Sequence, residues 1–126
     1  MQNQKSAIGL DGNVTALIGY IIGIVALIEI FIEKDNRFAR FHALQSVLYH
    51  VGFWVVFTVL WVIAFIVSLV LSQISSILGM LGMLIWLLLL LLFFVYLGGL
   101  IYAAIKAFQG SMFKLPVVGN MAEKWT

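Results

Sequence analysis

The sequence NRFARFHALQ, at residues 36–45, divides the chain into parts of different character. It contains both arginines of the protein and one of its two histidines. A long apolar segment precedes it, and residues 41–105 contain no Asp, Glu, Lys or Arg. Because charged side chains are rare inside a bilayer, this stretch marks the place where the chain passes from water into lipid.

The composition is that of an integral membrane protein. Hydrophobic residues make up 64% of the 126 residues and charged residues 10%, whereas soluble domains contain roughly half apolar and a quarter charged residues. The length predicts a single transmembrane domain, 1–126. The lack of cysteine excludes disulfides and cysteine-ligated metals. The net charge of +2 is too small to indicate a nucleic-acid partner.

Three apolar segments are each long enough to cross a bilayer. We predict transmembrane helices at about 13–32, 37–71 and 77–108. A helix over the first segment is about 30 Å long, which matches the hydrocarbon core. A cleavable signal peptide is the alternative there, but no small-residue cleavage site follows the segment. Residues 72–82 could form a loop, a re-entrant turn or a weak first turn of the third helix.

A short fourth helix is predicted at 116–125. It follows Pro116, a residue favoured at the first helical position. Its apolar residues share one face and its polar residues the other, which is typical of a helix lying in the membrane interface. The predicted fold class is therefore an all-α integral membrane protein with three transmembrane helices and a short C-terminal interfacial helix.

The basic residues predict the orientation of the chain. Three spans would place the loop at 33–42 and the C-terminal tail on one side of the membrane, with six basic residues, and Lys5 alone on the other side. Basic residues accumulate on the cytoplasmic side of membrane proteins. We therefore predict a multi-pass protein of a prokaryotic inner membrane, with the N-terminus outside and the C-terminus in the cytoplasm.

Small residues recur at helical spacing in the first and third predicted helices. Such stripes allow helix backbones to approach closely in lipid. The first stripe could serve packing within the chain or dimerisation. The residues predicted to pack between helices are Ala16, Gly19, Gly23, Gly99 and Ala103.

Glu29 is the one charged residue within the first apolar segment. A carboxylate inside a membrane is a functional candidate by default. Its position within one turn of the helix end favours another interpretation, in which the carboxylate lies at the interface and pairs with Arg37 or Arg40.

His42 and Gln45 lie on one face near the start of the second predicted helix. His50 follows His42 by about two turns, roughly 12 Å, which is too far for one metal unless other helices supply ligands. The sequence contains no paired carboxylates and no nucleophile with an adjacent base. We therefore predict no catalytic residue, metal or cofactor. We expect His42 and Gln45 to form hydrogen bonds with the C-terminal tail or with the turn at 33–36, and a partner or headgroup contact is the alternative.

Two motifs on the predicted cytoplasmic side resemble a known family. Residues 36–45 and the sequence KLPVVG at 114–119 are similar to the Arg-Phe-His-Ala-x-Gln and Lys-Leu-Pro-x-x-Gly motifs of a widespread family of small prokaryotic membrane proteins. That family is related to the twenty-kilodalton component of the chloroplast inner-envelope import translocon. The resemblance covers roughly residues 13–123. Some magnetosome-membrane proteins that affect crystal growth are similar too. The resemblance implies no established reaction, ligand or catalytic residue.

The predicted function is that of a non-enzymatic scaffold or accessory subunit of a membrane assembly, for example one for transport or protein translocation. Its expected partners are the lipid bilayer and either another membrane protein or a second copy of the chain. An oligomeric pore or carrier for a small solute or ion is the alternative. A membrane-embedded enzyme is a third hypothesis, with Glu29, His42 and His50 as its acid–base candidates. The residues expected to contact a partner or headgroup are Arg37, Arg40, His42, Gln45, Lys114, Pro116 and Gly119.

Overall fold

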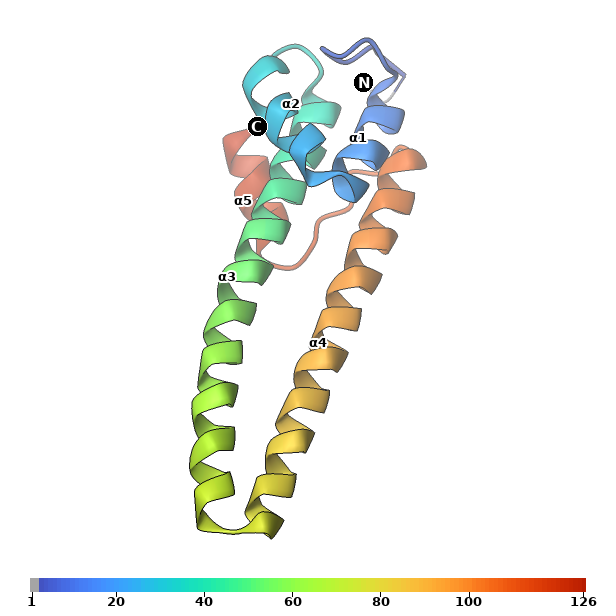
Figure 1. The fold of residues 1–126 in the computed structure, drawn as a ribbon. Helices are drawn as coiled ribbons and strands as arrows, with labels where there is room; N and C mark the ends of the chain where they lie inside the picture. Colours follow the sequence, from blue (N-terminus) through green and yellow to red (C-terminus); the bar gives the residue numbers. More distant parts are fainter. Residues whose placement is uncertain (1–2) are drawn as a thin grey trace. The chain divides into compact units, whose positions relative to one another are not determined.

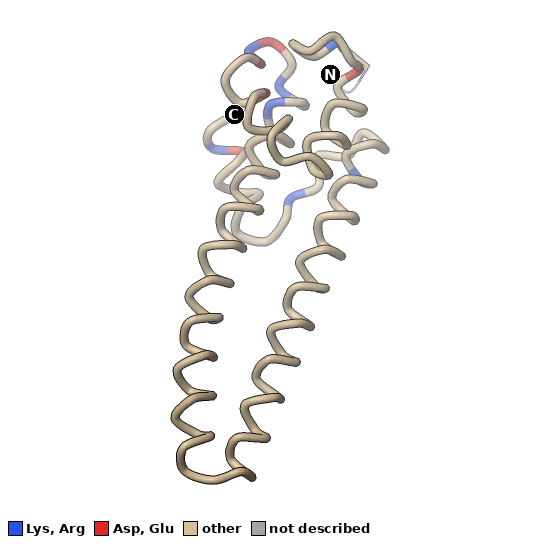
Figure 2. The backbone as a smooth tube through the Cα atoms, in the orientation of Figure 1, with Lys and Arg blue, Asp and Glu red and all other residues tan. Residues whose placement is uncertain are grey.

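The structure is a computed structural model that describes residues 3–126, most of them in helices. The helices are α1 (Gly12–Ile21), α2 (Gly23–Ile32), α3 (Arg37–Ile74), α4 (Ser76–Phe108) and α5 (Val118–Trp125) (Figure 1). The chain divides into two compact units. We call residues 3–51 with 98–126 the charged unit, and residues 52–97 the uncharged unit, because all seven basic and all five acidic residues lie in the first (Figure 2).

The helices α3 and α4 are long and apolar enough to cross a membrane. They contain 38 and 33 residues, which corresponds to about 57 and 50 Å at the α-helical rise per residue. Both lengths exceed the hydrocarbon core of about 30 Å. The two helices correspond to the spans predicted at 37–71 and 77–108.

A single residue, Ser75, separates α3 from α4. Its Oγ accepts a hydrogen bond from the backbone N–H of Leu78 at 3.1 Å, so Ser75 caps the N-terminus of α4. Residues 72–82 therefore form neither a long loop nor a re-entrant turn. The first three end α3, and those after Ser75 begin α4.

Within the uncharged unit, the two helical segments approach closely near this turn. A Cβ atom added to Gly82 would lie 3.0 Å from the Oγ of Ser68. Farther from the turn, the rings of Phe53 and Tyr96 stack with their centroids 4.0 Å apart. A glycine thus permits close packing near the turn, as in other pairs of membrane helices.

The first apolar segment differs from the single helix predicted at 13–32. Ile22 has an extended backbone conformation, with φ −114° and ψ 92°, and it separates α1 from α2. A Cβ atom at Gly19 would lie 3.4 Å from the Cβ of Ala26, whereas residues seven apart in a continuous helix lie roughly 10 Å apart. The segment is therefore a hairpin in which α2 returns beside α1 (Figure 1). Each of its helices has ten residues, or about 15 Å, too short to span the hydrocarbon core.

The hairpin returns the chain to the side on which it began. The backbone N–H of Ala7 donates to Glu33 Oε2 at 2.6 Å, and Asn36 Nδ2 donates to the carbonyl of Gln4 at 2.8 Å. The segment at 4–7 and the turn at 33–36 thus lie together. The predicted arrangement, in which a first span separates them by the thickness of a membrane, is wrong for this structure.

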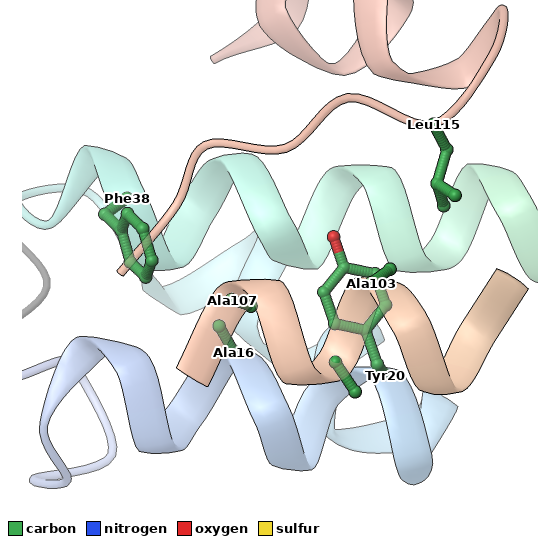
Figure 3. Close-up of a cluster of buried hydrophobic side chains, with 7 residues drawn as sticks. Ala16, Tyr20, Phe38, Ala103, Ala107 and Leu115 are labelled. Atoms are coloured by element: carbon green, nitrogen blue, oxygen red, sulfur yellow. The ribbon is translucent and has the colours of Figure 1, made fainter. Parts of the chain in front are cut away.

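The break also divides the predicted stripe of small residues. Ala16 packs with alanines at the end of α4, in a cluster that includes Ala103 (Figure 3). Gly19 instead faces α2, and a Cβ atom at Gly23 would lie 3.5 Å from the ring of His50. The small residues of this segment therefore serve three different contacts within the chain.

The core of the charged unit joins α1, α3, α4 and the tail. Alanines dominate its α4 side, which allows α1 to approach α4 closely. A second, smaller cluster joins α3 to α5 through Phe41, Leu44 and Ala122. The buried residues of the main cluster are Ala16, Tyr20, Phe38, Ala103, Ala104, Ala107 and Leu115 (Figure 3).

The tail leaves α4 through a glycine turn. Gly110 has φ +87°, and the N–H groups of Gly110 and Ser111 bond to the carbonyls of Ala107 and Lys106 at 3.0 Å. These bonds form a Schellman motif, which ends a helix and pairs its last carbonyls.

The final helix begins later than predicted. Val117 has φ +67°, which a helix cannot contain. Pro116 therefore lies in the turn before α5 and not at its first helical position. The Val118 N–H bonds to the Pro116 carbonyl at 2.8 Å within this turn.

We expect Gly19→Leu to open the α1–α2 hairpin, because the larger side chain would overlap α2 at Ala26. Overpacking of this kind costs ~1–3 kcal/mol of unfolding free energy. Gly98→Leu is the matched control, since a Cβ atom there meets nothing within 4 Å. Thermal unfolding in detergent, followed by circular dichroism, measures the difference. Equal losses in the two variants would contradict the hairpin.

Candidate functional site

A polar stripe on α3 faces the interior of the charged unit. Its members are His42, Gln45, Ser46 and His50, and the first three are buried. Positions three, four and eight residues apart share one face of a helix. The start of α3 fixes this face, because Asn36 Oδ1 accepts from the N–H of Ala39 at 3.1 Å and so caps the helix.

Two members of the stripe donate hydrogen bonds to backbone carbonyls at the end of α1. These carbonyls have no helical N–H partner because the helix breaks at Ile22. In a continuous helix the carbonyls of Gly19 and Tyr20 would accept from N–H groups four residues ahead. Here Ser46 Oγ donates to the Gly19 carbonyl at 2.8 Å, and His50 Nε2 donates to the Tyr20 carbonyl at 3.1 Å. Side chains of α3 therefore replace helical hydrogen bonds at the end of α1.

Arg40 likewise donates hydrogen bonds to backbone carbonyls at the end of α2. Its Nη1 donates to the carbonyls of Ile30 and Glu33 at 2.8 and 2.9 Å. Neither Arg40 nor Arg37 forms the predicted ion pair with Glu29. In the part of the chain that the structure describes, the ion pairs are Lys5–Asp11, at 2.7 Å, and Lys114–Glu123.

The centre of the site is a set of hydrogen bonds around the hydroxyl of Tyr20. His42 Nε2 lies 3.0 Å from the Ser111 carbonyl, which can only accept, so this nitrogen carries the proton. His42 Nδ1 therefore accepts from the Tyr20 hydroxyl at 2.7 Å. The same hydroxyl accepts from Gln45 Nε2 at 2.6 Å. The geometry thus defines one tautomer of His42 and one direction for each bond.

Gln45 joins this centre to the tail. Its Nε2 also donates to the Phe113 carbonyl at 2.9 Å, and its Oε1 accepts from the Leu115 N–H at 2.8 Å. A Cβ atom at Gly119 would lie 2.8 Å from that Oε1, so only glycine leaves room for the amide. These bonds confirm the expected contact of His42 and Gln45 with the tail, and neither residue bonds to the turn at 33–36.

Sequence reasoning did not identify Tyr20 or Glu33 as members of the site. Both are buried, and Glu33 accepts from the N–H groups of Ala7 and Asn36. A signal for Tyr20 existed, since a tyrosine in an apolar segment needs a partner for its hydroxyl. Glu33 lies in a polar turn, where a glutamate is usually exposed to water. No feature of the neighbouring sequence indicates that it is buried.

The remaining predicted site residues lie nearer the surface. Arg37 and Pro116 are exposed, and so is Lys114, which pairs with Glu123. That pairing lowers the pKa of the Glu123 carboxyl. Gly99 lies on α4 against the hydroxyl of Tyr49, which a Cβ atom would overlap. The polar stripe thus contains His42 and Gln45, while the basic residues border it.

Broken helical backbone is tolerated in a membrane protein where the surrounding protein pairs its polar groups. The chain has two long apolar helices, and side chains of α3 pair the backbone carbonyls at the break between α1 and α2. It is therefore a small helical membrane protein. It belongs to the magnetosome magnetite crystal formation protein family (MamF/MmsF), whose profile matches residues 5–122.

Archaeal membrane proteins are similar to the chain over most of its length. The UPF0132 membrane protein MJ1443 of Methanocaldococcus jannaschii is 29% identical, over 97% of this chain and 94% of its own. A UPF0132 membrane protein of Archaeoglobus fulgidus is 32% identical, over 89% and 92%. No solved structure matches significantly. The matches confirm a small prokaryotic membrane-protein family and a membrane location.

We expect Gln45→Leu to detach the tail from α3. The substitution leaves the Phe113 carbonyl and the Leu115 N–H buried without their partner, and each such group costs about 1–3 kcal/mol. Amide exchange at Leu115 should become much faster, and the unfolding temperature should fall. Gln73→Leu, at an exposed position of the same helix, is the control. Unchanged protection at Leu115 in Gln45→Leu would show that other contacts hold the tail.

Proposed function

We propose that the protein is a non-enzymatic scaffold or accessory subunit of a membrane assembly, and that its charged unit offers a fixed surface to a partner. The observation that carries this proposal is the set of bonds made by His42 and Gln45. Their polar atoms are engaged with Tyr20 and with backbone groups of the tail. Side chains held in this way suit positioning better than chemistry on a substrate.

We further propose that both termini lie in the cytoplasm. Two spans return the chain to the side on which it started, and the segment at 4–7 already lies with the turn at 33–36. All seven basic residues are in the charged unit and none is in residues 52–97. The cytoplasmic side is where basic residues accumulate. This orientation replaces the expectation of an external N-terminus.

The outer face of α5 is the candidate contact surface. Met121 and Trp125 are exposed and lie four residues apart on α5, and Val117 is exposed in the turn before this helix. Lys124 is exposed beside them. An apolar row with a tryptophan and a basic neighbour suits a position among lipid headgroups, where a partner bound to the same membrane could also reach it.

Family membership supports an assembly role in a general way. The family is described by its part in magnetite crystal formation in magnetosomes. The family that the two motifs at 36–45 and 114–119 resemble is also expected to be related to a component of a protein-import translocon. A subunit that organises other proteins at a membrane is consistent with both descriptions, and the translocon relationship remains a prediction.

Topology can be measured directly because the chain has no cysteine. We expect Gln73→Cys to react with a membrane-impermeant thiol reagent added to intact cells. Asn3→Cys and Asn120→Cys should react only after the membrane is permeabilised. All three positions are exposed. External labelling at position 3 combined with protection at 120 would restore the three-span arrangement.

The assembly role predicts specific co-purification. We expect the protein in mild detergent to retain a partner identified by mass spectrometry, and Met121→Glu with Trp125→Glu to lose it, because the two charges disrupt the apolar row. Phe31→Glu, at another exposed apolar position, is the matched control and should retain the partner. Recovery of the bare protein together with solute flux in liposomes would favour the pore alternative.

A further inference from the structure

Glu29 is a buried acid that the hydrogen bonds of the charged unit do not use. Its side chain is 1% exposed. Both of its carboxylate oxygens are buried without a hydrogen-bond partner. An ionised carboxylate in such a position is strongly disfavoured, since it has lost water without gaining a replacement. A buried polar group of this kind requires a physical explanation.

The neighbouring acid, Glu33, is in the opposite situation. It lies four residues later, at the end of α2, where side chains at this spacing are adjacent. Its two carboxylate oxygens accept from the backbone N–H groups of Ala7, Asp35 and Asn36. The pair therefore consists of one well-paired carboxylate and one acid that faces its negative charge.

The charged groups of the surrounding elements do not neutralise Glu29. Arg40 of α3 donates from its Nη1 to two backbone carbonyls at this end of α2 and forms no ion pair with Glu29. His50 of α3 lies against Gly23, at the other end of α2. On α5, Glu123 pairs with Lys114, and Lys124 is exposed. In the N-terminal segment, Lys5 pairs with Asp11, and α1 contains no charged residue.

A metal ion is a poor fit to this arrangement. Among residues 3–126 there is no group of three His, Asp or Glu side chains that could hold one. The oxygens of Glu33 already accept backbone N–H groups. A proton needs only one oxygen of Glu29 and removes the charge.

We propose that Glu29 is a proton-binding site of the charged unit, whose carboxyl group holds a proton in the folded protein and releases it to water as the pH rises. The O–H bond at Glu29 forms on uptake and breaks on release, and no other bond changes. Burial, followed by the negative charge of Glu33, raises the pKa of Glu29 from 4.5 to about 7. The site lies in α2, outside the two spanning helices.

The raised pKa of Glu29 determines in which direction its contribution to folding stability changes with pH. A folded state with the higher pKa binds more protons than the unfolded chain between pH 4.5 and about 7. The contribution of Glu29 to stability therefore falls as the pH rises through that interval and levels off above it. The difference in unfolding temperature between the full chain and Glu29→Gln, which cannot ionise, should follow this course in detergent.

Infrared spectroscopy tests the site itself. The full-length protein in detergent should show a carboxylic-acid C=O stretch that disappears with an apparent pKa near 7. Glu29→Gln should lack this band, and Glu123→Gln, which alters an exposed acid, should retain it. The same titration in the presence of a chelator tests for a bound metal.

Several results would overturn the proposal. These are the absence of an acid band from the wild-type protein above pH 6, a band that persists in Glu29→Gln, or a carboxylate band that shifts on adding the chelator. If Glu29→Gln does not fold, the wild-type protein alone decides. In that case a carboxylic-acid band of the wild-type protein that is lost below pH 6 would reject the site.

Discussion

The structure depends on one constraint. Backbone carbonyls that lose their helical N–H partners at the break in the first apolar segment must accept hydrogen bonds from other donors. Where water is absent, each unpaired group would cost several kcal/mol. Helix α3 supplies the donors from a single face, with Ser46 at the Gly19 carbonyl and His50 at the Tyr20 carbonyl. The hairpin is therefore held by side-chain bonds as well as by packing. This requirement explains why a helix otherwise rich in valine, leucine and phenylalanine carries polar residues at these positions.

The tail is fixed through the same face of α3, one turn away. Gln45 reaches Tyr20 and two backbone groups of the tail. The glycine turn at Gly110 directs the Ser111 carbonyl to His42, and the lack of a side chain at Gly119 admits the amide of Gln45. One helix thus organises two segments that are distant in sequence, and the polar part of the protein forms around its first four turns.

Composition and helical periodicity were sufficient to predict the two long helices and the contact of α3 with the tail. The charge-free run at 41–105 identified α3 and α4, and the shared face of His42 and Gln45 predicted their bonds to the tail. The break at Ile22 was missed because the segment contains no proline, and its glycines match an ordinary helix-packing stripe. The break depends on weak helix propensity combined with donors located more than twenty residues away. Glu33 was missed for the same reason, since Ala7 lies 26 residues before it.

The lack of charge in residues 41–105 also bears on how the protein reaches its membrane. When a helical pair inserts from one face, the turn between its helices must pass through the lipid. On insertion scales a charged residue at mid-bilayer costs about 2.5–3.5 kcal/mol. The turn at Ser75 contains only hydroxyl, amide and aliphatic side chains. In the topology that we propose, its passage requires no ionised group to be stripped of water, and α3 and α4 can enter the bilayer together while the basic residues stay on the side of synthesis.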